Sequence, residues 1–280
     1  MNQDNPEAYM ETKFNIPSIR QGYTVEVGDT YCHWFLPEHP GEGDRTLLEI
    51  FDMCYNQFRW DEFIPAGTTV IDIGAHSGDT TIPIQLINRS VVLAVEPNPI
   101  IKVYLDHACK MNRHLGKFIT AHEAVTTSNT EVEILDHFNS MCNGGVIDPS
   151  WTKELQERMR QMHGDKITVP GITLEELCNK YLTEEELNKL SFIKTDTEGH
   201  DISLLIAGAN LLDKYRPVLF VEWFFAFTEK ESAEMFGAID QLGYKAYYPQ
   251  TLKPALLSQR SEDLLLIHKS KISNYENLQA

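Results

Sequence analysis

The stretch of residues 68–81 constrains the fold of this chain more than any other. Residues 68–73 read TTVIDI, a β-branched run without proline that is typical of a buried strand. The run ends at Gly74, Gly78 follows, and residues 81–87 have the apolar content of an opening helix. A strand, a glycine turn and a helix N-terminus can present backbone N–H groups to a ligand. The stretch therefore predicts a nucleotide-binding turn, or an ordinary βα turn that contains two glycines.

A second apolar run favours the nucleotide-binding interpretation. Residues 91–95 read VVLAV and predict another strand, which is followed by Glu96, Pro97 and Asn98. An acidic residue about 20 positions after a glycine turn, at the end of the second strand of a βαβ unit, can accept both hydroxyls of a bound ribose. Glu96 is therefore the expected ribose ligand.

The glycine spacing separates two classes of nucleotide. Dinucleotide sites need glycine at the first, third and sixth positions, which here are Gly74, His76 and Asp79, so two of the three fail. Sites for S-adenosylmethionine (SAM) follow the pattern acid-x-Gly-x-Gly-x-Gly. Asp72, Gly74 and Gly78 fit this pattern, and only His76 is out of place. The turn therefore favours SAM over NAD.

These motifs resemble those of the FkbM-type SAM-dependent methyltransferases. The first motif of that family is similar to residues 72–78, with His76 in place of the usual Asn, and the second ends Val-Glu-Pro, as residues 95–97 do. The strongest match is the third motif, residues 172–177 (ITLEEL) followed by residues 192–199 (FIKTDTEG). A Leu-x-Gly-Ala segment and a Pro-led strand normally follow, and residues 206–209 and 217–222 are similar to them. The resemblance extends over about residues 60–270.

The resemblance implies a fold and a cofactor. The fold is an α/β, Rossmann-like SAM methyltransferase sandwich with a mainly parallel seven-stranded sheet, helices on both faces and an antiparallel last strand. Helices that alternate with apolar strands agree with this fold. The resemblance also implies SAM as cofactor, with the backbone near Glu123 beside the adenine. The residues expected to bind SAM are Asp72, Gly74, Ala75, His76, Gly78, Asp79, Thr80, Glu96, Pro97, Asn98, Glu123, Ala124, Val125 and Asp196.

A chain of 280 residues is long enough for one large α/β domain. Residues 1–60 are expected to form an N-terminal arm, a hairpin and a covering helix, and residues 61–270 the methyltransferase domain. Residues 137–164 form an insertion placed to act as a lid or acceptor wall, and residues 271–280 a tail. Residues 118–125 predict one strand and its exit.

Charge and cysteine content bound the partners. A formal net charge of -17 argues against nucleic acid and against an anionic membrane surface, because both bind clustered Lys and Arg. Five scattered cysteines without a CxxC pair fit a reducing cytoplasm, and no apolar run approaches a membrane span. The chain is therefore expected to be a soluble cytoplasmic protein. Its oligomeric state does not follow from the sequence.

The catalytic candidates are Lys194, Asp196, Glu198 and His200. They follow one another at the end of a predicted central strand, where open α/β sheets bind ligands. Asp196 is expected to position cofactor and acceptor, with Glu198 or His200 as the general base. The alternative is a Lys194–carboxylate pair that only fixes the turn, and His76 can likewise be a loop hydrogen-bonder. No HxxxH or clustered-acid spacing indicates a metal site, so none is expected.

Three functions remain open. The first is a SAM-dependent O-methyltransferase of a sugar-like or other small acceptor, which the resemblance implies. An acceptor hydroxyl of this kind needs a base within hydrogen-bond reach. The second is a nicotinamide-dependent oxidoreductase, which the glycine spacing disfavours. The third is a non-catalytic SAM-fold partner subunit, in which the cluster from Lys194 to His200 would be dispensable.

Overall fold

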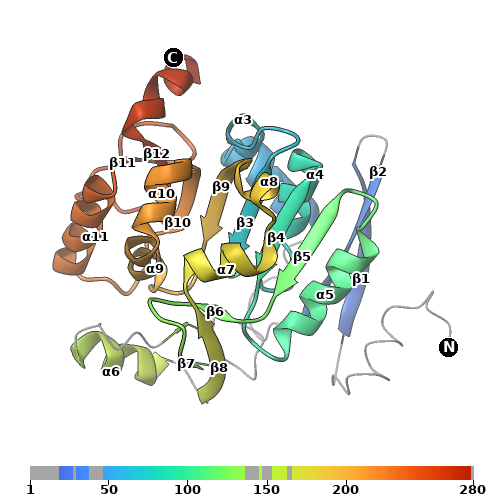
Figure 1. Ribbon diagram of the computed structural model, residues 1–280, viewed down its shortest axis with the longest axis horizontal. Coiled ribbons are helices and arrows are strands. Elements are labelled where there is room, and N and C mark those ends of the chain that lie inside the picture. Colours follow the sequence, from blue (N-terminus) through green and yellow to red (C-terminus); the bar gives the residue numbers. More distant parts are fainter. Residues whose placement is uncertain are drawn as a thin grey trace.

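The computed structural model describes residues 19–27, 30–37, 47–135, 145–146, 153–162 and 166–278. Seven strands form the central sheet, in the order β11-β12-β10-β9-β3-β4-β5 (Figure 1). Their bounds are β3 Thr69–Ile73, β4 Val91–Val95, β5 Lys117–Ala121, β9 Leu190–Thr195, β10 Val218–Glu222, β11 Tyr244–Tyr247 and β12 Asp263–His268. The expected seven-stranded α/β sheet is confirmed.

Strand β3 lies at the topological switch point of the sheet, because β4 and β5 follow on one side of it and β9 and β10 on the other. It pairs in parallel with β4 on one side and with β9 on the other, and β5 and β10 extend the sheet in parallel. The last strand, β12, runs antiparallel to both β10 and β11, as expected. Ligands of open α/β sheets bind at the carboxyl ends of the strands beside such a switch point. A ligand is therefore expected to bind where β3, β4, β9 and β10 end.

Helices cover both faces of the sheet because successive strand residues point to opposite sides. Ile71 and Ile73 of β3 pack into a core with residues of α7, α9, α10 and α11, whereas Val70 packs into a second core with residues of α3 and α4. Figure 1 shows α7 and α10 in front of the sheet and α3 behind it. The helices are α2 Leu47–Asp52, η1 Met53–Gln57, α3 Trp60–Phe63, α4 Thr81–Asn88, α5 Ile101–Met111, α6 Lys153–Met162, α7 Leu174–Tyr181, α8 Glu184–Leu187, α9 Asp201–Ala207, α10 Ala209–Tyr215, α11 Glu229–Gln241 and η2 Lys269–Leu278.

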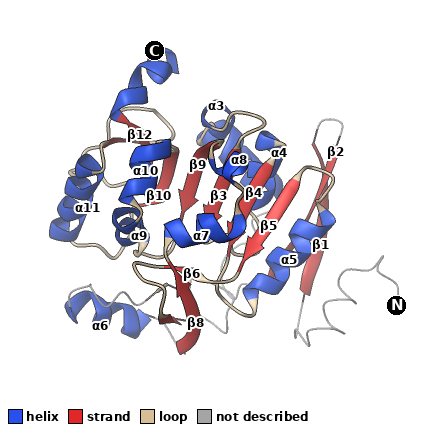
Figure 2. Ribbon diagram, in the orientation of Figure 1, coloured by secondary structure: helices blue, strands red, loops and turns tan. Residues whose placement is uncertain are grey.

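A small second sheet was not expected. It has the order β6-β8-β7, with bounds Ala124–Val125, Lys166–Ile172 and Glu131–Leu135. The strand predicted within residues 118–125 is present as β5, which ends at Ala121. The pairing of Ala124, in the exit from that strand, with Gly171 of β8 was not predicted. The side chain of Glu123 is held by Lys180 and Tyr181, which turns the chain between the two sheets. Figure 2 shows the small sheet beyond the carboxyl ends of the central strands.

The predicted N-terminal hairpin is present as β1 (Ile19–Val27) paired antiparallel with β2 (Thr30–Pro37). The expected covering helix is broken into α2, η1 and α3. The arm was expected at residues 1–19, of which residues 1–18 lie outside the described residues, as do the turn at residues 28–29 and most of the insertion at residues 137–164.

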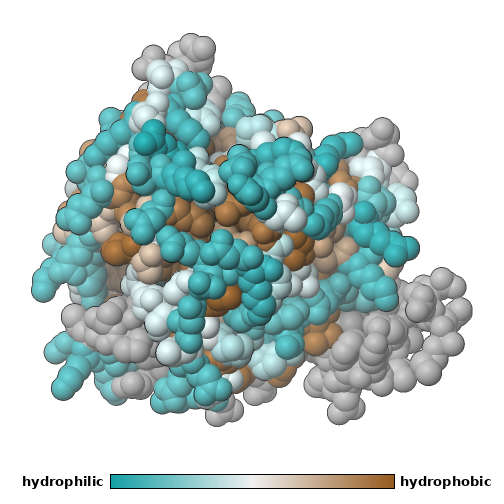
Figure 3. Space-filling view, in the orientation of Figure 1, coloured by the Kyte–Doolittle hydropathy of each residue, from teal (hydrophilic) through white to brown (hydrophobic). Residues whose placement is uncertain are grey.

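No described helix combines the length and the apolar character that a membrane crossing requires. Figure 3 shows mainly hydrophilic residues on one face of the molecule, with apolar residues gathered in a band across its middle.

Candidate active site

The glycine turn after β3 is tightly built. Gly74 has a φ of 74°, and a Cβ there would collide with the carbonyl oxygen of Asp196, so this position accepts glycine alone. The N–H groups of Gly74 and Ala75 both donate to the carbonyl oxygen of Val95 at 3.0 Å. These two N–H groups therefore hold the turn against β4 and do not face a ligand.

Asp72 and Lys194 form the floor of the turn. The Asp72 side chain is fully buried, and its Oδ2 accepts hydrogen bonds from Thr80 Oγ1 at 2.9 Å and Thr81 Oγ1 at 2.6 Å. Nζ of Lys194 lies 3.5 Å from Asp72 Oδ1 and 3.4 Å from Asp196 Oδ2. The glycine turn thus packs on a buried group of polar contacts that joins Asp72 to Thr80 and Lys194.

Asp79 completes this group of charges. Burial raises the pKa of its carboxyl, and the positive charge of Lys194 opposes that rise. Asp72 shows the same two opposing effects on its pKa. One ammonium group therefore faces three carboxylates, from Asp72, Asp79 and Asp196.

Glu96 joins the end of β4 to the glycine turn. Its Oε2 accepts the N–H of His76 at 3.0 Å, and its Oε1 accepts the N–H of Asn98 at 2.8 Å. The side chain is 7% exposed, and burial raises its pKa to about 7 despite these two donors. His76 has a φ of 46°, and its Nδ1 lies 3.2 Å from Ser77 Oγ.

The residues beside Glu96 have mainly structural contacts. Asn98 is buried, and its Oδ1 accepts the N–H groups of Ile100 and Ile101, so it caps the start of α5. Pro97, between Glu96 and Asn98, is partly exposed. Glu123, expected near the adenine, has its carboxylate bound by Lys180 and Tyr181 of α7, and Ala124 and Val125 are buried in β6.

The turn after β9 carries the remaining candidates. Asp196 is exposed, whereas Glu198 is 9% exposed and has a φ of 57°. Asp201 holds this turn, because its Oδ1 accepts Thr195 Oγ1 at 2.6 Å and the N–H of Thr197 at 3.1 Å. His200 is 1% exposed at the N-terminus of α9, so its ring is not presented to an acceptor.

Sequence reasoning missed the role of Glu222. This residue ends β10, and its carboxylate lies near those of Asp196 and Glu198, with one oxygen of each within 4.8 Å of the others. Burial, followed by the Asp196 carboxylate, raises the pKa of Glu222 well above its ordinary value. Asp263 of β12 lies opposite Glu222 of β10. Burial and the Asp196 carboxylate raise the pKa of Asp263 to about 7. The signal in the sequence is an acid that ends an apolar strand.

The N-terminal segment covers the outer side of the glycine turn. Nε1 of Trp34 on β2 donates to Ser77 Oγ at 3.1 Å, and both side chains are buried. Burial raises the pKa of the Cys54 thiol on η1, and the nearby carboxylates of Asp79 and Asp72 raise it further. Residues of β2 and η1 therefore lie against the glycine turn.

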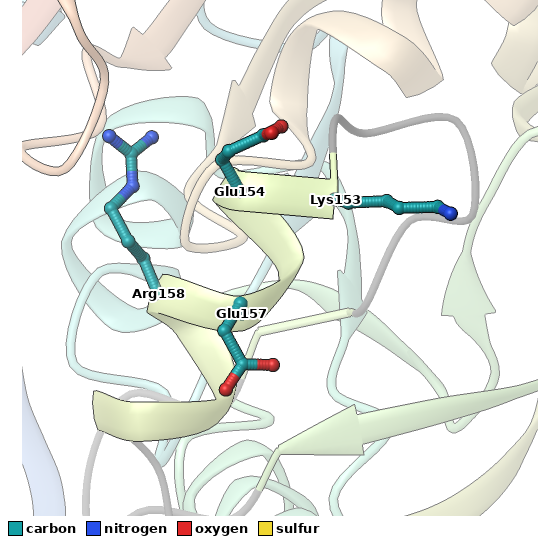
Figure 4. Close-up of a pocket in the computed structure, with 4 residues that line it drawn as sticks. All are labelled: Lys153, Glu154, Glu157 and Arg158. Atoms are coloured by element: carbon teal, nitrogen blue, oxygen red, sulfur yellow. The ribbon is translucent and has the colours of Figure 1, made fainter.

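A hollow of about 490 Å³ lies elsewhere, on α6. Its walls are Lys153, Glu154, Glu157 and Arg158, whose side chains point in different directions from one helix (Figure 4). Arg158 is bound to Glu231 of α11 at 2.9 Å. The carboxyl edge of the central sheet gathers the candidate residues, so the hollow on α6 is not the candidate site.

Comparison with solved structures gives similar but distant proteins. An FkbM methyltransferase from Methylobacillus flagellatus KT has a TM-score of 0.43 and 12% identity, over 74% of this chain and 44% of that chain. The 16S rRNA N2 G1207 methyltransferase RsmC of T. thermophilus, solved with AdoMet and guanosine, has a TM-score of 0.41 and 16% identity, over 90% of this chain and 51% of that chain. A Pyrococcus furiosus methyltransferase has a TM-score of 0.40 and 10% identity, over 94% of this chain and 93% of that chain. This chain thus spans about half the length of the first two proteins.

Comparison at the sequence level gives one clear result. No curated protein sequence matches the chain. The family model described as the methyltransferase FkbM domain matches residues 72–246, from the acid of the glycine turn to β11. This match covers more than half of the 280 residues. The chain belongs to the FkbM methyltransferase family.

Proposed function

We propose that the protein transfers the methyl group of SAM to a hydroxyl oxygen of a sugar-like or other small acceptor. The contact between Glu96 and the glycine turn carries the proposal. The carboxylate of Glu96 accepts the N–H of His76 at 3.0 Å, so the expected ribose ligand and the turn form one unit. The membership of a methyltransferase family supports the same reaction class.

The residues present fit SAM. A carboxylate has about four acceptor positions, and the Glu96 carboxylate uses two of them for the N–H groups of His76 and Asn98. Each oxygen therefore keeps a position for one ribose hydroxyl. Gly74 lets the turn lie against the exit of β9, which brings Asp196 next to the same turn. We expect Asp72, Asp79 and Lys194 to support this arrangement and not to contact the acceptor.

SAM supplies an electrophilic methyl group, and transfer from a sulfonium needs alignment more than help for the leaving thioether. Asp196 is exposed beside the turn and is assigned to hold the acceptor hydroxyl by a charge-assisted hydrogen bond. Asp196 and Glu198 are the candidates for receiving the hydroxyl proton. His200 is buried beneath the turn, so we do not assign it this role.

Negative charge argues for a small acceptor. The formal net charge of -17 disfavours nucleic acid, whose phosphates need clustered Lys and Arg. We also place the protein in the cytoplasm, a proposal supported by the free thiols of Cys32, Cys54, Cys109 and Cys178, which suit a reducing compartment.

Calorimetric titration with SAM, its demethylated product and NAD tests the cofactor. Binding of the first two without NAD is expected, and binding of NAD alone would establish the oxidoreductase alternative instead. Transfer from methyl-labelled SAM is then measured on a glycan and metabolite panel and on ribosomal RNA. Label on RNA alone would overturn the acceptor class. SAM binding without transfer to any acceptor would favour a non-catalytic partner subunit.

A further inference from the structure

The geometry points to a divalent-cation site formed by Asp196, Glu198 and Glu222. One carboxylate oxygen of each residue lies within 4.8 Å of those of the other two. Opposite ligands of a cation with bonds of about 2.0–2.6 Å stand about 4–5 Å apart, so the three oxygens fit around one ion. The inference rests on the proposed function in one respect, because the ion would act on the acceptor hydroxyl at the same edge.

The register of the sheet brings the three residues together. Val221 of β10 lies beside Thr195 of β9, so the next residues along the two parallel strands, Glu222 and Asp196, leave the sheet side by side. Glu198 follows in the turn, where its left-handed backbone brings the chain back. Three acids separated by up to 26 positions thus converge, and no short sequence motif contains them.

The Glu198 side chain and one oxygen of Glu222 are buried, and neither has a hydrogen-bond donor among the described residues. Glu198 is 9% exposed, and no described residue donates a hydrogen bond to its carboxylate or forms an ion pair with it. Glu222 is half-buried, but its Oε2 is fully buried and has no hydrogen-bond partner in the part of the chain that the structure describes. Buried carboxylates are normally paired, hydrogen-bonded or bound to a metal. These oxygens therefore point to a ligand that carries positive charge.

Lys194 supplies only part of that charge, because it forms an ion pair with Asp196 but not with Glu198 or Glu222. Its Nζ donates to the carbonyl oxygen of Gly74 at 2.9 Å and lies near Asp72 and Asp196, on the β3 side of the cluster. Among the described residues, no Lys or Arg forms an ion pair with Glu198 or Glu222. Two more acids, Asp201 and Asp263, add negative charge nearby. A cation at the cluster would offset this excess.

The donor set selects the kind of ion. Three carboxylate oxygens are hard ligands, which suit Mg²⁺, Mn²⁺ or Ca²⁺ and not a thiol-preferring metal. Glu198 and Glu222 approach from the buried side, whereas Asp196 has 45% of its side chain exposed. An ion held in this way keeps open positions toward solvent. A hydroxyl oxygen of the acceptor that binds there would lose its proton more easily.

Binding of Mn²⁺ to the full chain, without SAM or acceptor, tests the site. Electron paramagnetic resonance of free Mn²⁺ should show one saturable site per chain in the parent protein. Glu222→Gln and Glu198→Gln remove one ligand charge each and nearly conserve shape, so each should weaken Mn²⁺ binding at least about tenfold. Glu234→Gln is the matched control, since this exposed acid lies on α11 and should bind Mn²⁺ like the parent.

Thermal unfolding with and without Mn²⁺ gives a second measurement. The ion should raise the melting temperature of the parent and of Glu234→Gln but not that of Glu222→Gln. Equal Mn²⁺ affinity in the parent and both cluster variants, or no saturable site, would overturn the inference. SAM titrations on the same samples separate the two proposals. SAM binding without Mn²⁺ binding refutes only the metal site, and Mn²⁺ binding without SAM binding refutes only the proposed function.

Discussion

Nζ of Lys194 donates a hydrogen bond of 2.9 Å to the carbonyl oxygen of Gly74, which ties the glycine turn after β3 to β9. The same ammonium lies 3.5 Å from the fully buried Asp72. Burial alone would lower the pKa of Lys194, but the carboxylates of Asp196, Asp72 and Asp79 outweigh this effect and raise it. Lys194 therefore stays charged and compensates the negative charge beneath the turn.

Replacing Lys194 with Met should destabilise the protein strongly. The variant leaves Asp72 charged, buried and without its ammonium partner, which typically costs about 3–5 kcal/mol. Urea unfolding of the parent and of Lys194→Met measures the difference. The double variant Lys194→Met, Asp72→Asn should recover part of the loss, because the charge of the fully buried Asp72 is removed and only Asp79 and Asp196 lose their ammonium partner.

The exposed pair Lys189–Glu185, at 2.8 Å, provides the control. Lys189→Met should cost less than about 1 kcal/mol, since exposed ion pairs contribute little. A loss in Lys194→Met no larger than in Lys189→Met would contradict the supporting role assigned to Lys194.

Alanine substitutions at Gly67 and Gly74 distinguish the cost of left-handed backbone strain from the cost of steric crowding. Gly74 and Gly67 have φ of 74° and 82°, but a Cβ at Gly74 meets the Asp196 carbonyl whereas a Cβ at Gly67 meets nothing within 4 Å. Gly67→Ala should cost about 1–2 kcal/mol for the left-handed backbone alone. Gly74→Ala should cost about 1–3 kcal/mol more through overpacking and should also weaken SAM binding. Unfolding and SAM titration of both variants check this, and equal behaviour would exclude the close contact.

The sheet was predictable from the sequence because its inner strands, such as β3 and β4, are buried on both faces. Runs such as residues 91–95 are apolar without interruption, and their order along the chain alternates with helices. The small sheet was not predictable, since β6 has two residues and its pairing with β8 depends on contacts that are distant in sequence.

Residues of the candidate site were predictable where a single continuous segment of the sequence contains the motif. The motifs identified Asp72, Gly74, Glu96 and Asp196 because each lies at the end of a strand with a recognisable pattern. The proximity of Glu222 to Asp196 depends on the pairing of β10 with β9, which no local pattern specifies. Lys194 points inward to Asp72 and Gly74, a direction set by the three-dimensional packing of the turn.

Asn112 should anchor the N-terminal hairpin. Its Oδ1 accepts the N–H of His33 at 2.8 Å, and its Nδ2 donates to the carbonyl oxygens of His33 at 2.5 Å and Ala108 at 2.8 Å. Asn112→Ala removes these bonds from a buried position and should cost about 2–3 kcal/mol. Hydrogen exchange should then accelerate in β2 but not in β4. Asn56→Ala, which removes a bond to Asp52 at an exposed position, should leave exchange in β2 unchanged. Unchanged protection of β2 in Asn112→Ala would contradict the anchoring role.

The affinity for SAM should depend on pH through Glu96. Burial raises the pKa of this carboxyl from 4.5 to about 7, so its ionised form, which we propose accepts the ribose hydroxyls, is lost as pH falls below about 7. SAM affinity should therefore weaken by up to about tenfold per pH unit below that point. Ionisation of the buried group costs free energy, so the stability contributed by Glu96 without ligand should change in the opposite direction and fall as pH rises from 4.5 to 7. These opposite signs separate weaker SAM binding from unfolding.

Glu96→Ala removes two charge-assisted hydrogen bonds, worth about 2–4 kcal/mol. This variant should lower SAM affinity about 30- to 1000-fold and flatten the pH profile. The control Glu234→Ala should do neither. Calorimetric titrations between pH 5.5 and 8.5, at roughly one-unit steps, measure both effects. A parent profile without pH dependence, or a Glu96→Ala variant that binds SAM like the parent, would refute the assignment of Glu96 to the ribose.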